Sequence, residues 1–335
     1  MSSVPPHQNF LAHPVVAVVG PTASGKSAVA LQLAKALGGE IVSTDSMQVY
    51  RGMDLGTAKP TAEEQALVPH HLIDVVNPDT PFSAGRYVEQ AQQVLARLQE
   101  EGKVAVLCGG TGLYFRALLY GLAQIPDIPP DVRAEVQALV EDQGLAAAYA
   151  RLQALDPQMA HRLEPADTSR IMRALEVFLA TGESLAEFQA QQPFYRHNPM
   201  VLQVGVQWPR EVLYERINHR TRQMLEQGWA AEVQALLQAG YGGTKPMQSI
   251  GYLELAAHLV AGGSTAPDAW PQALAPAIAQ RTRHYAKRQL TWFRKDETIR
   301  WVAPTTPNHP DMAEQMTEQI QEDVRFFLKN TPAIR

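Results

Sequence analysis

The chain has 335 residues and a net charge of −5; 45% of its residues are hydrophobic and 19% are charged. These proportions are those of globular proteins and exclude a disordered chain, a coiled-coil rod and a collagen-like fibre. At about 150 residues per domain, the length predicts roughly two domains. Because 34 acidic residues outnumber 29 basic ones, binding to a nucleic acid would need a local basic face.

No segment of the sequence predicts membrane insertion or secretion. The longest apolar runs, such as Val15–Val19 and Val104–Cys108, fall far short of the ~20 residues that cross a bilayer. No charged start followed by a long apolar stretch marks a signal peptide. The single cysteine, Cys108, excludes an internal disulfide and a cysteine-based zinc site. We therefore expect a cytoplasmic protein in a reducing compartment, with no membrane partner.

The first third of the chain alternates strand and helix patterns. The continuous apolar run Val15–Val19 predicts a strand that is buried on both faces of a parallel sheet. Lys26–Leu37 repeats apolar residues on one helical face and ends at two glycines. Ile41–Thr44 predicts the next strand. Strand, helix and strand within about thirty residues indicate a βαβ unit.

The same alternation continues to about residue 121. Leu72–Val76 predicts a strand, Ser83–Glu101 a helix, Val104–Cys108 a further buried strand and Leu113–Tyr120 a helix. The sequence therefore predicts an α/β domain with a parallel sheet flanked by helices.

A different pattern follows a proline-rich linker at residues 125–130. No strand pattern is found up to about Gln189, and Asp167 is a plausible N-cap of a helix that ends at Thr181-Gly182. Val201–Gln207 then restores a strand, and Met312–Leu328 predicts one late, weak helix. We expect a discontinuous core (14–125 and 200–300), an all-helical insertion (126–199), and tails (1–13 and 301–335).

Residues 20–27 match the phosphate-loop pattern G-x-x-x-x-G-K-[ST]. The match lies between a predicted strand and a predicted helix, which is the context that the motif requires. Backbone N–H groups and the helix N-terminus attract a phosphate chain, Lys26 adds a charge, and Ser27 offers a hydroxyl to Mg²⁺. The motif predicts a P-loop NTPase-like core that binds a polyphosphate, without specifying ATP.

One expected acid of P-loop ATPases is missing. The strand that would carry a Mg²⁺-binding aspartate ends at Cys108 and Gly109. Asp45 instead follows the second predicted strand, at the edge where ligands of open α/β sheets collect. Asp45 could bind Mg²⁺ through water, act as a base, or simply be a turn aspartate. The missing acid argues against an ordinary motor or switch NTPase.

Basic residues gather late in the chain. Residues 281–295 contain six Lys or Arg residues, no acid and three aromatic residues, a mixture that could bind RNA or simply form a solvated helix. Arg216 and Arg220 lie one helical turn apart and could hold an anion between them. Because adjacent strand residues point to opposite faces, His70 and His71 are structural rather than metal ligands.

Several segments together resemble the tRNA dimethylallyltransferases, also called tRNA isopentenyltransferases. The resemblance runs in family order over about residues 14–296. The matching segments are Gly20–Ser27, Asp45–Pro60, His70–Asp74, Phe82–Gly85, Gly109–Tyr114, Arg170–Val177, Thr181-Gly182, Ser249–Tyr252 and Lys287–Arg294. The phosphate loop is shared by many families, whereas Asp45–Pro60 and Lys287–Trp292 are specific to this one.

The resemblance implies a reaction. The phosphate loop would hold the pyrophosphate of dimethylallyl diphosphate, and the prenyl group would pass to N6 of adenine 37 of a tRNA, giving i6A37. Asp45 matches the family's general base, Thr111 would lie in the reaction channel, and Arg220 would neutralise the leaving group. Mg²⁺ would assist through Ser27. The loop residues implied to bind pyrophosphate are Gly20, Pro21, Thr22, Ala23, Ser24, Gly25, Lys26 and Ser27.

The resemblance also implies that the helical insertion grips the tRNA anticodon stem-loop. Separately, we expect the chain to act as a monomer. Ser169, Thr221 and Gln248 depart from the residues common in the family. The implied RNA contacts are Asp45, Ser46, Met47, Gln48, Thr111, Arg133, Ser169, Arg170, Ile171, Met172, Arg173, Gln248, Ser249, Ile250, Gly251, Tyr252, Leu253, Lys287, Arg288, Gln289, Leu290, Thr291, Trp292, Phe293 and Arg294.

Two other functions remain open on sequence grounds. A P-loop nucleotide or small-molecule kinase with a helical lid explains the phosphate loop but gives the basic segment no role. An RNA-binding protein with a vestigial nucleotide site would not need the intact Lys26, Ser27 and Asp45. The donor that is consumed, ATP or dimethylallyl diphosphate, distinguishes the kinase from the prenyltransferase.

Overall fold

The computed structural model describes residues 11, 13–190, 198–266, 270–304 and 312–331. The chain divides into two compact units, one of Met1–Tyr120 with His197–Arg335 and one of Gly121–Arg196. The first unit contains a parallel sheet flanked by helices, and the second is helical over its described residues. The predicted fold class is therefore confirmed.

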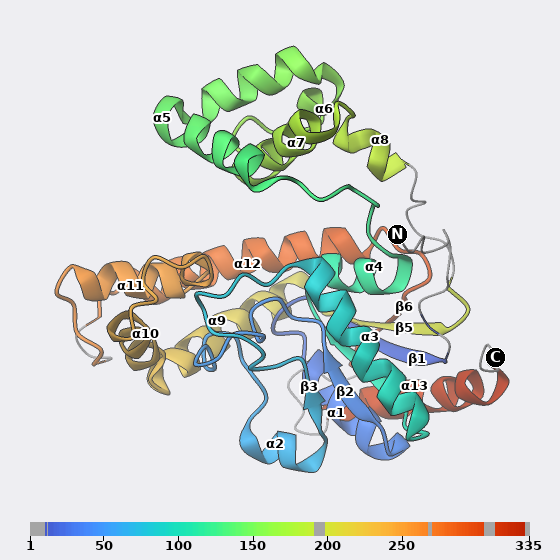
Figure 1. The fold of residues 1–335 in the computed structure, drawn as a ribbon. Helices are drawn as coiled ribbons and strands as arrows, with labels where there is room; N and C mark the ends of the chain where they lie inside the picture. The colour runs from blue at the N-terminus through green and yellow to red at the C-terminus, as the bar shows by residue number, and fades with distance from the viewer. Residues whose placement is uncertain (1–10, 12, 191–197, 267–269, 305–311, 332–335) are drawn as a thin grey trace. The chain divides into compact units, whose positions relative to one another are not determined.

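A six-stranded parallel sheet forms the centre of the first unit (Figure 1). Its strand order is β3-β2-β4-β1-β5-β6. The strands are β1 (Val15–Val19), β2 (Glu40–Ser43), β3 (His70–His71), β4 (Ala105–Gly109), β5 (Val201–Val206) and β6 (Arg300–Val302). Val16 lies opposite Val106 on one side and Leu202 on the other. Because all strands run in one direction, the loops after β1, β2 and β4 meet at one edge.

Alternate residues of β1 belong to two different cores. Val16 and Val18 pack in a cluster with α1 (Lys26–Leu37) and α13 (Met312–Asn330). Ala17 and Val19 pack in a second cluster with α3 (Ala84–Glu100) and α4 (Gly112–Tyr120). This two-sided burial explains why β1 and β4 are continuous apolar runs without alternating polar residues.

A further helical layer lies beside the edge where the strands end. It contains α9 (Arg210–Glu226), α10 (Trp229–Gln238), a short 3₁₀ turn η1 (Pro246–Gln248), α11 (Tyr252–Val260) and α12 (Leu274–Phe293). Figure 1 shows α12 as the long helix that runs along α9. A cluster that includes Val49, Met53, Trp229 and Tyr252 packs the 45–60 segment against this layer.

Two predictions about strands and tails are wrong. The strand predicted at Leu72–Val76 does not form, because Leu72 and Asp74 have φ values of 62° and 53° and cannot continue a strand. The third strand is His70–His71, which pairs with β2, and the short helix α2 (Ala62–Leu67) before it was not predicted. Val76 makes only an isolated bridge to Tyr50.

The segment predicted as a C-terminal tail (301–335) instead contributes to the core. β6 pairs with β5, and the late helix was correctly predicted, but as α13 it packs Met316, Ile320 and Val324 against α1. Pro304, Pro307 and Pro310 are typical of a loop, so the sequence after residue 300 was predicted as a tail. The short strand β6 just before these prolines was not predicted.

The second unit has its own hydrophobic core. It contains α5 (Pro130–Leu155, interrupted by the non-helical Gly144), α6 (Pro157–His161), α7 (Thr168–Thr181) and α8 (Leu185–Ala190). Asp167 caps α7 by accepting a hydrogen bond from the Arg170 backbone N–H, and Gly182 ends the helix in the left-handed region, as predicted.

A buried carboxylate lies in β2, at the first residue of that strand. Glu40 lies 2.6 Å from His71 Nε2 and accepts a hydrogen bond from Lys103 Nζ at 2.7 Å. Burial alone would raise the pKa of Glu40, but the hydrogen bonds from Lys103 and His71 outweigh it and hold the pKa below the usual 4.5. The cluster therefore ties β2 to β3 and to the residues before β4.

We predict that Glu40→Gln lowers the free energy of unfolding at pH 7 by about 1–3 kcal/mol, because the charged hydrogen bonds are lost. Because the pKa of Glu40 is lower in the folded than in the unfolded state, the ionised carboxylate stabilises the fold fully above pH ~4.5. This stabilisation is lost as the pH falls through the lowered pKa of the folded state. Urea unfolding should therefore show a smaller difference in the free energy of unfolding between wild type and Glu40→Gln at about pH 3.5 than at pH 7. Glu89→Gln, at an exposed position of α3, serves as control. An advantage of equal size at both pH values would contradict this account.

Candidate functional site

The phosphate loop at residues 20–27 joins β1 to α1 and has the backbone geometry of an anion cradle. Gly20 and Gly25 have φ values of 149° and 90°, in the region that favours glycine. A Cβ on Gly20 would lie 2.7 Å from the Val206 carbonyl oxygen, so no larger residue fits. α1 begins at Lys26 with no side-chain cap, which leaves its first backbone N–H groups to bind a ligand.

Lys26 and Ser27 line the pocket above this loop. Lys26 Nζ donates a hydrogen bond to the Pro21 carbonyl oxygen at 3.3 Å. Burial lowers the pKa of the Lys26 ammonium, and the nearby Asp45 carboxylate opposes that shift. Lys26 is therefore a partly buried ammonium whose hydrogen-bond partner is neutral, and an anion bound beside it would stabilise its charge.

α9 and the segment between β5 and α9 hold the loop in place. Arg216 Nε donates to the Ala23 carbonyl oxygen at 2.9 Å, and Trp208 Nε1 donates to the Ser24 carbonyl oxygen at 2.7 Å. The Arg216 guanidinium also lies 4.6 Å from the centre of the Trp208 ring. These contacts hold the carbonyl groups of Ala23 and Ser24 and so fix the conformation of the loop. Arg216 thus has a structural partner, which the prediction of a shared anion did not include.

Arg220 lies one turn further along α9 and lines the pocket. Burial lowers the pKa of its guanidinium, while the carboxylate of Asp45 opposes the shift. Arg220 is therefore a desolvated cation that is electrostatically coupled to Asp45, and a phosphate group would be a suitable partner.

Asp45 lies just past the end of β2. Its Oδ1 accepts a hydrogen bond from the Met47 backbone N–H at 2.8 Å, which is the turn geometry that the sequence left open. The Thr111 hydroxyl accepts from the Ser46 backbone N–H at 3.0 Å and donates to Ser46 Oγ at 3.2 Å. Thr111 N–H also donates to the Thr44 carbonyl oxygen. The loops after β2 and β4 are therefore joined directly beside Asp45.

Two side chains that sequence reasoning missed or undervalued hold the 45–60 segment in place. Glu232 of α10 accepts hydrogen bonds from the backbone N–H groups of Asp54, Leu55 and Gly56, and from the Tyr252 hydroxyl at 2.6 Å. The buried Lys59 ammonium donates to Asp74 at 2.6 Å. A glutamate within a helix and a lysine in a loop give no local signal, because their partners are distant in the sequence.

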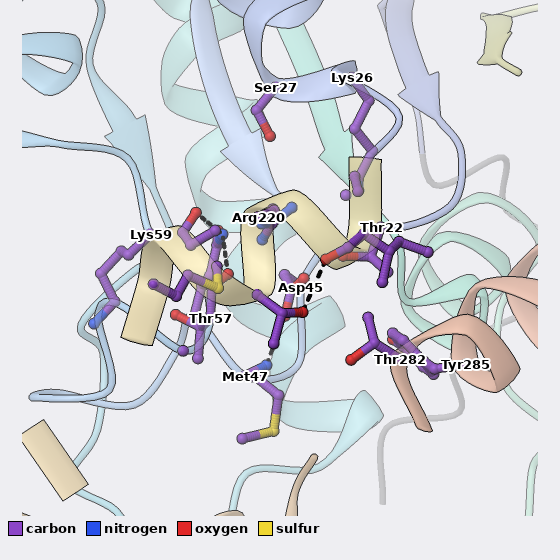
Figure 2. A pocket seen from close by; sticks show the side chains of 18 of the residues that line it. Thr22, Lys26, Ser27, Asp45, Met47, Thr57, Lys59, Arg220, Thr282 and Tyr285 are labelled. Carbon is purple, nitrogen blue, oxygen red and sulfur yellow. Dashed lines mark hydrogen bonds between the residues drawn. The ribbon is translucent and has the colours of Figure 1, made fainter. Parts of the chain in front are cut away.

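These elements surround a pocket of about 1510 Å³. Figure 2 shows Asp45 near its centre, with Lys26 and Ser27 towards one side and Thr282 and Tyr285 of α12 towards another. The volume exceeds the ~300–1,000 Å³ typical of small-ligand sites, so the pocket has room for more than one reactant.

Many of the residues predicted from sequence line this pocket together. They come from the phosphate loop, the loop after β2, α9, the 248–252 segment and α12, and they are Thr22, Ala23, Gly25, Lys26, Ser27, Asp45, Ser46, Met47, Gln48, Arg220, Gln248, Ser249, Ile250, Tyr252, Arg288 and Gln289. Arg133 and residues 169–173 belong to the second unit and are not among the lining residues.

Some side chains implied as RNA contacts are instead interior, which corrects those assignments. Ile171 is fully buried in the core of the second unit, and Phe293 is buried against Phe115. Leu290 packs on the sheet cluster, and Gln289 hydrogen-bonds within the protein. The implied contacts were consecutive runs of residues, and a run on a helix contains residues from its buried face as well as from its exposed face. The 3.6-residue period of the helix distinguishes the two faces.

The outward face of α12 carries Lys287, Arg288, Thr291 and, just past its end, Arg294, all of which are exposed. Of the six basic residues at 281–295, Arg281 pairs with Glu254 and Arg283 donates to Asn218 at 2.6 Å. The segment was predicted either to bind RNA or to be a solvated helix, and the two halves of the helix differ in this respect. The basic residues of the first half have protein partners, whereas the exposed Lys287, Arg288 and Arg294 are suited to binding phosphates.

No group of three or more His, Cys, Asp or Glu side chains in the described residues could hold a metal ion. His70 Nδ1 lies 2.8 Å from the Val68 carbonyl oxygen and His71 contacts Glu40, so the two histidines have separate partners. Within the same described ranges, every helix is too short or too polar to cross a membrane.

An anion cradle, two desolvated cations and the Asp45 carboxylate open into one pocket, while β4 ends without an acid. This combination defines the class: a P-loop fold with a pocket suited to a phosphorylated ligand.

Comparisons with known proteins specify the family. The family model described as IPP transferase matches residues 48–296. The tRNA dimethylallyltransferase of Geobacter metallireducens is 49% identical over 289 residues, which cover 86% of this chain and 92% of that protein. The enzyme of the same description from Magnetococcus marinus is 44% identical over 317 residues, or 93% and 98% of the two chains.

A solved structure agrees. The full-length tRNA isopentenylpyrophosphate transferase of Bacillus halodurans superimposes with a TM-score of 0.67 at 36% identity, covering 95% of this chain and 98% of that one. The chain therefore belongs to the IPP transferase family.

The reactivity of Cys108, which lines the pocket at the end of β4, reports how deeply this part of the pocket is buried. Burial raises the pKa of the Cys108 thiol to about 11, so little thiolate is present at neutral pH. We predict that iodoacetamide labels the folded protein slowly at about pH 7.5 and that the rate still climbs between about pH 9 and 10, where an ordinary thiol has levelled off. Intact-mass spectrometry counts the adducts.

Protein unfolded in urea provides the control for this labelling, because its thiol should titrate at the ordinary value near 8.5. Equal labelling rates for folded and unfolded protein at about pH 7.5 would contradict the predicted burial.

Proposed function

We propose that this chain transfers the dimethylallyl group of dimethylallyl diphosphate to N6 of adenosine 37 in tRNA, giving N6-(dimethylallyl)adenosine and diphosphate. One observation carries the proposal: the Asp45 carboxylate and the phosphate loop open into the same pocket. The relatives described as tRNA dimethylallyltransferases support the overall reaction. In the reaction, the donor C–O bond breaks, a C–N bond forms, and the amine proton passes to Asp45.

The donor side of the pocket suits a diphosphate. The N-terminus of α1, Thr22, Lys26 and Ser27 surround the phosphate loop, and Arg220 approaches from α9. Negative charge grows on the diphosphate as the C–O bond breaks. Fixed cations and N–H groups that already point there stabilise the transition state more than the ground state.

Mg²⁺ fits this site through a small number of protein ligands. The exposed Ser27 hydroxyl lies at the N-terminus of α1, while β4 ends in Cys108 and Gly109 and provides no carboxylate. Because Mg²⁺ commonly keeps several waters and binds substrate phosphates, Ser27 with diphosphate oxygens would suffice. When bound, the ion would neutralise charge on the leaving group.

Asp45 is the proposed general base. The exocyclic amine of adenine is a poor nucleophile, and removing its proton during attack makes the transfer feasible. The hydrogen bond from Met47 N–H fixes the orientation of the Asp45 carboxylate, and Thr111 holds the adjoining Ser46. The adenine must leave its stack to enter, which costs a few kcal/mol.

The proposed tRNA contacts include the exposed basic face of α12, at Lys287, Arg288 and Arg294. The second unit would grip the anticodon stem-loop through Arg133, Ser169, Arg170 and Arg173, all at least partly exposed. Phosphate contacts of this kind make binding depend on salt concentration. We propose that the chain acts as a monomer, and a tRNA substrate is consistent with the cytoplasm.

The first test measures donor and base together. We expect wild-type protein, Mg²⁺ and dimethylallyl diphosphate to prenylate an unmodified tRNA that carries adenine 37, detected by mass spectrometry of digested nucleosides. Asp45→Asn should lower kcat by about 10²–10⁴-fold, because the base is removed at nearly constant shape. Asp79→Asn, at an exposed position away from the pocket, is the matched control.

The outcome also decides between the prenyltransferase and the kinase that the phosphate loop would allow. A parallel incubation replaces the donor with ATP, and consumption of ATP with no prenylated nucleoside in the first incubation would overturn the proposal. Full activity of Asp45→Asn would remove Asp45 as the base while leaving the reaction in place.

Arg220 and Arg210 offer a second contrast on the same helix. Arg220→Gln should reduce kcat by about 10²-fold and weaken inhibition by inorganic diphosphate, because a desolvated cation facing the leaving group is lost. Arg210→Gln, exposed and absent from the pocket lining, should leave both quantities close to wild type. Equal inhibition of the wild-type and Arg220→Gln enzymes by diphosphate would refute the leaving-group role.

A further inference from the structure

Gln289 occupies an unusual place on α12. It lies between the exposed Lys287, Arg288 and Thr291 in sequence, yet only 6% of its surface is exposed. Its Oε1 accepts a hydrogen bond from the Thr22 backbone N–H at 2.8 Å. Its Nε2 donates to the Gly110 carbonyl oxygen at 2.9 Å. Both ends of one side-chain amide are therefore used inside the protein.

The two hydrogen bonds join the two halves of the reacting site. Thr22 belongs to the phosphate loop, which is proposed to bind the leaving group. Gly110 precedes Thr111, whose hydroxyl holds Ser46 next to Asp45. A Cβ on Gly110 would lie 2.2 Å from Gln289 Nε2, so the approach of the amide depends on glycine at that position.

We propose that Gln289 is a positioning residue, which sets the separation between the phosphate loop and the Thr111–Asp45 pair and makes no contact with RNA. The inference rests on the proposed function, because that separation determines how closely the prenyl carbon and the adenine amine approach each other. When reacting groups are misplaced by about 1 Å, the rate can fall by about 10²-fold.

Only a primary amide of this length meets both requirements. The site needs an acceptor for Thr22 N–H and a donor for the Gly110 carbonyl oxygen within one side chain. Glutamate keeps the acceptor but places a second oxygen against the carbonyl, and methionine provides neither group. Substitution therefore leaves buried backbone groups unpaired, and the two loops are free to shift.

The experiment compares steady-state kinetics of Gln289→Met, Gln289→Glu and Arg288→Gln with those of the wild-type enzyme. We expect kcat of Gln289→Met to fall by about 10²-fold, while KM for tRNA stays within about twofold. Arg288→Gln should show the opposite split, with KM for tRNA raised several-fold, because an exposed phosphate contact is lost. Gln280→Met, an exposed change on the same helix, should match wild type.

Thermal unfolding of each variant separates positioning from loss of the fold. Should Gln289→Met fail to fold, Gln289→Glu, which conserves shape and one hydrogen bond, carries the kinetic test. A Gln289 variant that raises KM for tRNA at unchanged kcat would make the residue an RNA contact and overturn the inference, as would kinetics identical to wild type.

Failure of the proposed function is visible separately, as absence of prenyl transfer by the wild-type enzyme. Titration with inorganic diphosphate then decides the question, since a loosened Thr22 should weaken binding several-fold in Gln289→Met and not in Gln280→Met. Equal binding by both variants would overturn the inference.

Discussion

The parallel direction of the strands is the constraint on which the site depends. β1, β2 and β4 end at one edge of the sheet, so the phosphate loop, Asp45 and Thr111 come together although they lie up to 91 residues apart (20 to 111). Each strand end is then fixed by its neighbours: Thr111 holds Ser46, and Arg216 holds Ala23. The chemistry is assembled by topology and refined by a few long-range hydrogen bonds.

Electrostatics give this edge its preference for an anion. Lys26 and Arg220 are both desolvated, and their common carboxylate neighbour is Asp45, which also belongs to the turn with Met47. Two cations beside one carboxylate leave a net positive site within a chain of negative total charge. Desolvating such cations is costly in the free protein, and a bound anion would offset that cost.

The sequence was most informative where local patterns determine structure. Buried strands, the phosphate loop, the Asp167 cap and the position of Asp45 follow from composition and periodicity within a few residues. The sequence was least informative where partners are remote. The backbone N–H groups that Glu232 accepts from lie 176–178 residues away, and the two partners of Gln289 lie 179 and 267 residues away. The edge strand β6 is only three residues long and depends on β5 to form at all.

The helix α13 has a consequence for the limits of the folded unit. The family match ends at residue 296, yet α13 begins at Met312, whose Cε would lie 2.8 Å from a Cβ on Gly25, and it buries the outer side of α1. A fragment that ended at residue 296 would lack α13, and the apolar cluster around Val29 and Leu33 of α1 would be exposed to water. The folded unit therefore extends beyond the matched residues, and α13 places Met312 in the wall of the pocket beside the phosphate loop.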